Sequence, residues 1–330
     1  MSLYRLARPL LFSLDPETAH RLGLQLAGLV RRKEFRCPVS AMGLQFPNPV
    51  GLAAGLDKDA AHIDALARMG FGFIEVGTVT PRPQPGNARP RLFRIPEKEA
   101  LINRFGFNNV GVDEFLLNIG LTRWRGLLGI NIGKNADTPV ERAIDDYRLC
   151  LEKVYPAASY VTINISSPNT AGLRSLQERD TLEDLLEKLA TLRQALTQKH
   201  GKRVPLVLKI APDLASEDIP SIAASVQRHG IDGVIATNTS VSREGVEGLP
   251  HADETGGLSG APIRSRSTRV LKELSYSLAG TTLIGAGGIM SGEDAAEKRA
   301  AGASLIQLYT GLVYRGPGLV RECVSAYRAK

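Results

Sequence analysis

The sequence predicts an α/β protein: a (β/α)8 (TIM) barrel with an N-terminal helical extension. Short β-branched runs recur eight times along the 330 residues, and helical patterns lie between most of them. The chain is 43% hydrophobic but has only 9 Phe, 8 Tyr and 1 Trp, a composition typical of a parallel sheet with an aliphatic core. A doubly wound open sheet is the alternative, because strand spacing alone does not determine whether a parallel sheet closes.

The first evidence for the barrel is the set of apolar runs, most of which end in glycine or in a polar cluster. We expect residues 41–330 to form the barrel domain, a length that one barrel can accommodate. The eight expected strands are Pro49–Gly55, Phe71–Thr80, Leu127–Gly133, Tyr160–Ser167, Leu206–Ala211, Gly233–Asn238, Thr281–Gly288 and Ser304–Gly311.

Helical patterns separate most of these runs, and several begin with a Ser, Thr or Asp that can cap a helix. The expected helices are Asp59–Met69, Thr138–Val154, Thr181–Lys199, Ser216–His229 and Ser291–Ala301. Two stretches interrupt the alternation after the second strand. Residues 81–96 contain five prolines and are expected to form an extended loop, and Val110–Thr122 is expected to be an additional helical region.

Residues 1–40 form a separate basic and amphipathic segment. Asp15 and Pro16 suit the start of a helix, and apolar residues follow at helical spacing. The segment has seven basic and three acidic residues, so it holds +4 of the net charge of +7. Such a helical segment could lie on an anionic lipid surface or pack against the barrel itself.

Several classes of protein are excluded. Cys37, Cys150 and Cys323 are far apart and unpaired in sequence, so neither a disulfide framework nor a metal site is expected. The N-terminus does not resemble a signal peptide. The longest apolar stretch, Leu22–Val30, is far shorter than the roughly 20 residues needed to span a bilayer.

Polar residues gather where the expected strands end, which is where barrel enzymes place their sites. Four of these ends carry carboxamides or small residues that admit a flat ligand, and Asn131, Asn164, Asn169 and Asn238 should converge there. A carboxamide offers both a donor and an acceptor without the cost of burying a charge. This pattern favours a heterocycle of the pyrimidine or flavin type.

Two further features indicate an anionic ligand. Lys209 lies inside a buried strand, where an ammonium group needs an anion or an electron-rich ring as its partner. Gly285–Gly288 follow the seventh strand and precede a helix capped by Ser291. In barrels this position commonly binds phosphate through bare backbone N–H groups. A phosphorylated cofactor is therefore expected.

Six motifs resemble those of the flavin-dependent dihydroorotate dehydrogenases, specifically the membrane-associated class that reduces quinone. They are spread over almost the whole chain, and the family fold agrees with the barrel inferred from the strands. The motifs are Gly51–Asp59, Gly77–Gly86, Asn103–Asn109, Gly129–Asn135, Asn164–Thr170 and Thr255–Gly260.

The resemblance implies oxidation of (S)-dihydroorotate to orotate in pyrimidine synthesis, with FMN accepting the hydride and a membrane quinone accepting the electrons. Ser167 occupies the position of the catalytic base, and it would need Thr170 as a relay and Phe107 as a shield. The cytosolic class has a cysteine at that position, and none of the three cysteines lies in this loop.

The resemblance also assigns binding residues. Substrate would be held by Lys58, Asn103, Arg104, Phe105, Gly106, Phe107, Asn164, Asn169, Asn238 and Thr239. FMN would be held by Ala54, Gly55, Leu56, Asp57, Lys58, Thr78, Asn131, Asn164, Lys209, Thr237, Gly260, Gly288, Tyr309 and Thr310. The quinone would pass through the N-terminal segment to His20, Arg94 and Tyr309.

The same reading implies a monomer with no nucleic-acid partner, peripheral on the cytoplasmic side of the cell's inner membrane and bound to anionic lipid through residues 1–40. Three alternative functions predict features that this sequence lacks or leave some of its residues unexplained. A cytosolic dihydroorotate dehydrogenase would have cysteine in place of Ser167. A tRNA-dihydrouridine synthase would carry an RNA-binding C-terminal domain. A catalytically silent membrane adaptor would not need Lys58, Lys209 and Ser167 together.

Overall fold

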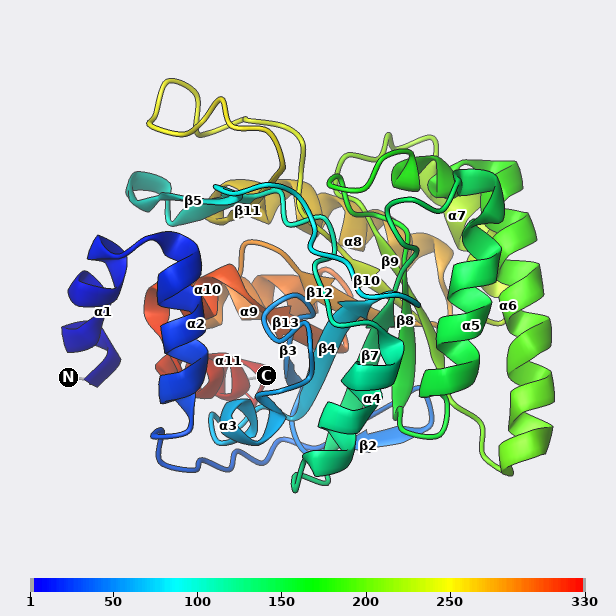
Figure 1. Cartoon of the computed structure of the whole chain (residues 1–330). Coiled ribbons are helices and arrows are strands. Elements are labelled where there is room, and N and C mark those ends of the chain that lie inside the picture. The colour runs from blue at the N-terminus through cyan, green and yellow to red at the C-terminus, as the bar shows by residue number, and fades with distance from the viewer. Residues whose placement is uncertain (1–2, 329–330) are drawn as a thin grey trace.

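The barrel closes. A computed structural model describes residues 3–328, so residues 1 and 2 of the basic N-terminal segment lie outside the described part (Figure 1). Eight parallel strands pair in the order β10-β12-β13-β3-β4-β7-β8-β9, and β9 pairs with β10 to complete the ring. The prediction of a (β/α)8 barrel is therefore confirmed, and the open-sheet alternative is wrong.

All eight expected strands form, but each is shorter than expected at its C-terminal end. The polar residues that follow each apolar run leave the sheet and enter loops, which makes the mouth of the barrel polar. The barrel strands are β3 Val50–Leu52, β4 Phe73–Val79, β7 Leu127–Ile132, β8 Tyr160–Asn164, β9 Leu206–Ile210, β10 Gly233–Ala236, β12 Thr282–Ala286 and β13 Leu305–Leu308.

The helices surround the barrel (Figure 1) and bury apolar faces against the strands. Six of them lie within or close to the predicted ranges: α3 Ile63–Ala67, α4 Val112–Leu121, α5 Ala143–Val154, α6 Arg179–His200, α7 Ile219–Arg228 and α9 Gly292–Ala300. Three others in the barrel domain had no predicted counterpart: α8 Arg264–Ser277, α10 Thr310–Arg315 and α11 Gly318–Arg328.

The bottom of the barrel is covered by a two-stranded antiparallel hairpin, β1 Val39–Ala41 and β2 Leu44–Phe46. Phe46 contacts Phe73 edge to face at 5.2 Å between ring centroids. Both rings are fully buried, so the barrel interior is packed at this end and the open end lies at the opposite, C-terminal ends of the strands.

A second, three-stranded antiparallel sheet stands beside the open end (Figure 1). It contains β5 Leu92–Ile95, β6 Ala100–Asn103 and β11 Gly257–Gly260, in the order β11-β6-β5. The expectation that residues 81–96 form only an extended loop is thus wrong for its last part. The chain after Pro90 pairs with β6, and this pairing satisfies its backbone groups.

The N-terminal segment forms two helices on one side of the barrel, α1 Leu3–Ser13 and α2 Pro16–Ala27 (Figure 1). The Asp15 side chain accepts a hydrogen bond from the Thr18 N–H and caps α2 as predicted. Within residues 3–328, no helix combines the length and the apolar character needed to cross a bilayer. Glu17 of α2 pairs with Arg91 beside β5 at 2.9 Å.

The apolar stripe of these helices is only partly covered by the barrel. Ala19 and Ala27 of α2 are buried, but Leu6 and Leu10 of α1 are 67% and 72% exposed, and Leu29, which follows α2, is 80% exposed. The barrel therefore accounts for one side of the stripe and leaves several leucines in contact with solvent. Such exposed apolar side chains on a basic segment are typical of a surface that meets another apolar phase.

Candidate active site

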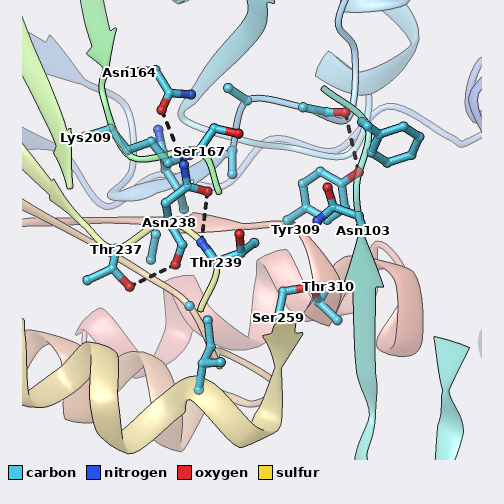
Figure 2. A pocket seen from close by; sticks show the side chains of 18 of the residues that line it. Asn103, Asn164, Ser167, Lys209, Thr237, Asn238, Thr239, Ser259, Tyr309 and Thr310 are labelled. Carbon is cyan, nitrogen blue, oxygen red and sulfur yellow. Dashed lines mark hydrogen bonds between the residues drawn. The ribbon is translucent and has the colours of Figure 1, made fainter. Parts of the chain in front are cut away.

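A pocket opens at the C-terminal ends of the barrel strands, and residues of the second sheet, among them Asn103 and Ser259, form part of its lining (Figure 2). We refer to it as the strand-end pocket. Of the residues predicted from the sequence, it brings together Ala54, Gly55, Lys58, Thr78, Asn103, Phe105, Gly106, Phe107, Asn164, Ser167, Asn169, Lys209, Thr237, Asn238, Thr239, Gly260, Gly288, Tyr309 and Thr310.

Five of the residues predicted for catalysis, substrate or FMN do not line this pocket. Arg104 forms an ion pair with Glu254 at 2.6 Å. Asp57 accepts hydrogen bonds from the backbone N–H groups of residues 61 and 62, and Leu56 faces the N-terminal helices. Asn131 and Thr170 are buried behind the pocket wall. These residues can influence the pocket only through their neighbours.

Three of the four predicted carboxamides form one hydrogen-bonded series that runs down into the barrel, and the fourth, Asn169, bonds to Asn103. Asn238 Nδ2 donates to Asn164 Oδ1 at 3.3 Å, Asn164 Nδ2 donates to Asn131 Oδ1 at 3.1 Å, and Asn131 Nδ2 donates to Glu75 Oε1 at 2.8 Å. Thr78 Oγ1 joins the series by donating to Asn131 Oδ1 at 2.5 Å. The predicted convergence of amides is therefore present in the structure, and Asn131 takes part from below the pocket.

Lys58 provides a cation at the edge of the pocket. Its ammonium donates to the Gly55 carbonyl at 2.8 Å and lies 3.9 Å from the centre of the Phe105 ring. Burial lowers the pKa of Lys58 to about 8. No carboxylate pairs with this ammonium in the described part of the chain, so it is available to an anionic ligand.

Lys209 lies on β9 at the floor of the pocket (Figure 2). Burial lowers the pKa of its ammonium, and the negative charge of Glu75 acts in the opposite direction. Among the described residues the ammonium has no hydrogen-bond partner. An unpaired cation in a buried strand is costly, and a ligand with a developing negative charge would compensate for it.

Ser167 lies in the loop after β8 and is almost fully buried. Its Oγ accepts a hydrogen bond from the backbone N–H of Asn169 at 3.2 Å. A donor at this oxygen stabilises the negative charge that grows there when the hydroxyl proton is shared or lost. Phe107 lines the same pocket, and the hydroxyl of Thr170 is buried with no partner among the described residues.

Bare backbone forms the wall of the pocket between β12 and α9. Gly287 and Gly288 have φ of +99° and +74°, and a Cβ on Gly288 would lie 2.4 Å from the Arg264 Cα. No side chain fits at Gly288, so the N–H groups of this turn stay exposed to a ligand. Ser291 caps α9 by accepting from the Asp294 N–H at 3.1 Å. The arrangement suits a phosphate group.

A second cavity lies between α1, α2 and the barrel, and we refer to it as the helix-side cavity. His20, Arg94 and Tyr309 all line it, as predicted for the quinone passage. Burial, with a further contribution from Lys58, lowers the pKa of His20 to about 3, so its imidazole is neutral at physiological pH. Tyr309 also lines the strand-end pocket, and this side chain separates the two cavities.

Sequence reasoning missed several residues of the strand-end pocket. Most lie next to a predicted one and contribute backbone or apolar surface: Ala53, Pro168, Ile263, Ile289, Leu308 and Gly311. Ala286 and Gly287 also line the pocket, and they belong to the turn Gly285–Gly288 that the sequence predicted for phosphate. Ser259 and Gln307 contribute polar groups. The signal for Gln307 was available, because it is the polar residue within the buried run Leu305–Leu308, a placement that requires a hydrogen-bonding partner.

Comparison with known proteins identifies the family. The sequence profile named dihydroorotate dehydrogenase matches residues 37–326. Proteins named dihydroorotate dehydrogenase (quinone) from Pseudomonas savastanoi pv. phaseolicola and Pseudomonas aeruginosa (strain LESB58) are each 59% identical over 337 residues. In both comparisons the alignment covers 99% of this chain and 98% of the relative.

Solved structures of proteins named DHODH also match this chain. DHODH from Eimeria tenella in complex with ferulenol matches with a TM-score of 0.89 and 38% identity, over 95% of this chain and 90% of that one. The ligand-free form from the same organism matches with a TM-score of 0.88 and 40% identity, over 95% of this chain and 94% of that one. The chain therefore belongs to the dihydroorotate dehydrogenase family, and within it to the quinone-dependent class.

Proposed function

We propose that this protein oxidises (S)-dihydroorotate to orotate in pyrimidine synthesis, with FMN as the hydride acceptor and a membrane quinone as the final electron acceptor. The observation that carries the proposal is the position of Tyr309, which lines both the strand-end pocket and the helix-side cavity. One wall thus separates a polar pocket suited to dihydroorotate from an apolar cavity suited to a quinone.

The residues present fit FMN. The pocket floor has a cation without a partner at Lys209 and a buried acceptor without a partner at Gln307 Oε1, and the turn at Gly288 has no room for a side chain. We assign FMN to Ala54, Gly55, Thr78, Lys209, Thr237, Gly260, Gly288, Tyr309 and Thr310, with Leu56, Asp57, Lys58, Asn131 and Asn164 as supporting or shared groups. When bound, FMN supplies the ring that accepts the hydride from C6 of dihydroorotate.

Ser167 takes the proton from C5 of the substrate. The Asn169 N–H on its Oγ stabilises the charge that develops there. Phe107 shields the hydroxyl within the pocket, and Thr170, buried nearby in the same loop, is the group assigned to relay the proton. Loss of a proton from C5 and a hydride from C6 leaves the C5–C6 double bond of orotate.

Lys58 and the carboxamides hold the substrate. The Lys58 ammonium pairs with the carboxylate of dihydroorotate. The Asn169 Nδ2 donates to Asn103 Oδ1 at 3.2 Å, so these two amides act as a unit on the alternating C=O and N–H groups of the ring. Asn164, Asn238, Thr239, Phe105 and Gly106 complete this subsite, and Arg104 supports it through Glu254.

Residues 1–40 form the quinone and membrane segment, and residues 41–330 the catalytic domain. The exposed leucines of α1 and α2 would enter the acyl boundary of the bilayer, and the net charge of +4 would meet anionic head groups. We infer a monomer attached to the cytoplasmic side of the inner membrane. Quinone would reach His20, Arg94 and Tyr309 through the helix-side cavity.

The test compares electron acceptors. Purified protein should be yellow and contain one FMN per chain, dihydroorotate should bleach the flavin under anaerobic conditions, and a short-chain ubiquinone or menaquinone should restore the colour. Fumarate and NAD⁺ should restore it at least about a hundredfold more slowly, since neither fits an apolar cavity. Equal rates with fumarate or NAD⁺ would overturn the assignment of the acceptor.

A further inference from the structure

Glu75 is a fully buried carboxylate inside the barrel, below the strand-end pocket. It lies on β4 and accepts four hydrogen bonds from three other strands. The donors are Asn131 Nδ2 at 2.8 Å, Tyr160 OH at 2.9 Å, Thr162 Oγ1 at 3.1 Å and Gln307 Nε2 at 2.7 Å. None of the substrate or cofactor assignments above uses it.

The carboxylate determines which way the neighbouring carboxamides face. A carboxamide donates at its nitrogen and accepts at its oxygen, whereas a carboxylate only accepts. Because Asn131 gives its N–H2 group to Glu75, its Oδ1 must point away, and it accepts there from Thr78 Oγ1 and Asn164 Nδ2. The orientation of Asn164, which lines the pocket, therefore follows from the charge on Glu75 two residues away in the series.

Gln307 is fixed in the same way. Its Nε2 donates to Glu75 Oε2, so its Oε1 faces the other direction. That oxygen is buried and has no partner among the described residues, and Gln307 lines the strand-end pocket. A buried acceptor without a partner is costly, which indicates that a ligand N–H completes this hydrogen bond.

Glu75 also provides a negative charge to Lys209, which lacks a carboxylate at contact distance among the described residues. Lys209 and Glu75 lie on β9 and β4, and Asn164 and Asn131 lie on β8 and β7 between them. The carboxylate thus acts on the pocket floor through two routes, the amide series and the opposite charge.

We propose that Glu75 is a positioning residue of the flavin site, whose carboxylate orients Asn131 and Gln307 so that the Gln307 oxygen is presented to an N–H of the isoalloxazine ring. The inference rests on the proposed function, because it takes FMN as the ligand. Glu75 touches neither the substrate nor the cofactor. It acts on the pocket through the side-chain amides of Asn131 and Gln307.

The test replaces Glu75 by Gln, which has the same shape but brings an N–H2 group against one of the two amide donors, because Asn131 and Gln307 donate to different oxygens of the carboxylate. One of these amides must then rotate. We expect Glu75→Gln to fold, to bind FMN about tenfold or more weakly than the wild type, and to shift the midpoint potential of bound FMN to a more positive value. The potential rises because losing a buried negative charge favours the more negative reduced flavin.

A double-mutant cycle tests the route through Gln307. Gln307→Met removes the presented oxygen and should also weaken FMN binding about fivefold or more. If Glu75 acts through Gln307, the double variant should be no worse than the weaker-binding single variant, whereas fully additive losses would overturn this route. FMN affinity is measured by release of flavin fluorescence on dilution of the holoenzyme.

Asp146→Asn is the matched control. Asp146 is also a buried carboxylate and accepts from the Asn135 N–H at 2.8 Å, but it lies on α5 and does not line the pocket. Its replacement should lower the melting temperature without changing FMN affinity or potential. If Glu75→Gln behaves like this control, Glu75 is merely structural and the proposal is wrong.

Three further outcomes are informative. If Glu75→Gln does not fold, the FMN affinity of Gln307→Met alone tests the proposal. An unchanged affinity in that variant would overturn it. If the wild-type protein binds no FMN, the proposed function itself fails. If the wild type binds FMN and is reduced by dihydroorotate while Glu75→Gln matches it in affinity and potential, only this inference fails.

Discussion

The ammonium of Lys58 lies over the face of Phe105, 3.9 Å from the ring centre. Arg91 approaches the same ring, with its guanidinium carbon 5.4 Å from the centroid, and Arg91 in turn pairs with Glu17 of α2. An aromatic ring therefore connects the cation of the strand-end pocket with the ion pair that docks the N-terminal helices. Cation–π contacts of this kind stabilise a buried cation without neutralising it.

The first prediction concerns pH. Lys58 has a pKa of about 8, so it is cationic below pH 8 and loses its proton as the pH rises through that value. We expect kcat/KM for dihydroorotate to fall up to about tenfold per pH unit above pH 8, because the neutral amine no longer attracts the substrate carboxylate. Lys58→Met should lower kcat/KM about a hundredfold and remove this alkaline limb. A flat wild-type profile between about pH 7 and pH 10 would contradict the role of Lys58.

The second prediction concerns the base. Ser167→Ala should retain FMN but reduce it with dihydroorotate about 10²- to 10⁴-fold more slowly, as measured by anaerobic stopped-flow absorbance. Ser240→Ala is the control, since Ser240 is also a buried hydroxyl but bonds to Asp213 and does not line the pocket. An undiminished rate in Ser167→Ala would mean that another group takes the proton.

The third prediction concerns the phosphate turn. Gly288→Ala places a Cβ 2.4 Å from the Arg264 Cα at a φ of +74°, so the turn must shift and FMN should bind at least about a hundredfold more weakly. Gly280→Ala is matched in conformation, with φ of +80°, but its Cβ would meet nothing within 4 Å. It should cost only about 1 kcal/mol of stability. Equal FMN affinity in the two variants would remove this turn from the cofactor site.

The fourth prediction concerns the exposed leucines. The double variant Leu10→Gln/Leu29→Gln should sediment with vesicles rich in phosphatidylglycerol about tenfold less than the wild type, because two apolar anchors are lost. Flavin reduction by dihydroorotate should not change. Tyr276→Gln on α8 is the control, since Tyr276 is 76% exposed but lies outside the N-terminal segment. A similar loss in both variants would argue against a dedicated membrane face.

The fifth prediction separates the two half-reactions. Removing residues 1–38 takes away α1 and α2, and with them one side of the helix-side cavity, but leaves β1 of the hairpin at the barrel bottom in place. Turnover with quinone should fall about a hundredfold or more, whereas anaerobic reduction of the flavin should fall less than about fivefold. Equal loss of both activities would mean that the segment only supports the barrel.

The barrel and most of its pocket were predictable because they depend on local patterns. Each barrel strand is one apolar run, and polar residues at or near the C-terminal end of the run reach the pocket, so Asn164, Lys209 and Asn238 could be placed from sequence order alone. Parallel strands all open at the same end. The approximate positions of the site residues therefore follow once the strands are recognised.

The remaining features depend on contacts between distant segments. β11 pairs with β6 across more than 150 residues, and its sequence, Gly257–Gly260, has the composition of a turn. α8 has few apolar residues, and its helical pattern is correspondingly weak. Arg104 and Asn131 lie in the expected motifs, but their side chains bond to Glu254 and Glu75 and do not line the pocket. Thr170 also lies in an expected motif, but its hydroxyl is buried outside the pocket lining without a partner among the described residues. Sequence order does not determine such orientations.

The first helix of the chain is held by one of the last. Arg8 of α1 donates to the Tyr314 carbonyl of α10 at 3.0 Å, and the Tyr4 hydroxyl donates to the Val313 carbonyl. On the ribosome, α1 leaves the exit tunnel roughly 300 residues before its docking site does, at a synthesis rate of about 5–20 residues per second. The basic, leucine-bearing segment thus stays undocked for many seconds of translation. A nascent chain could reach the bilayer during that time, before its barrel has closed.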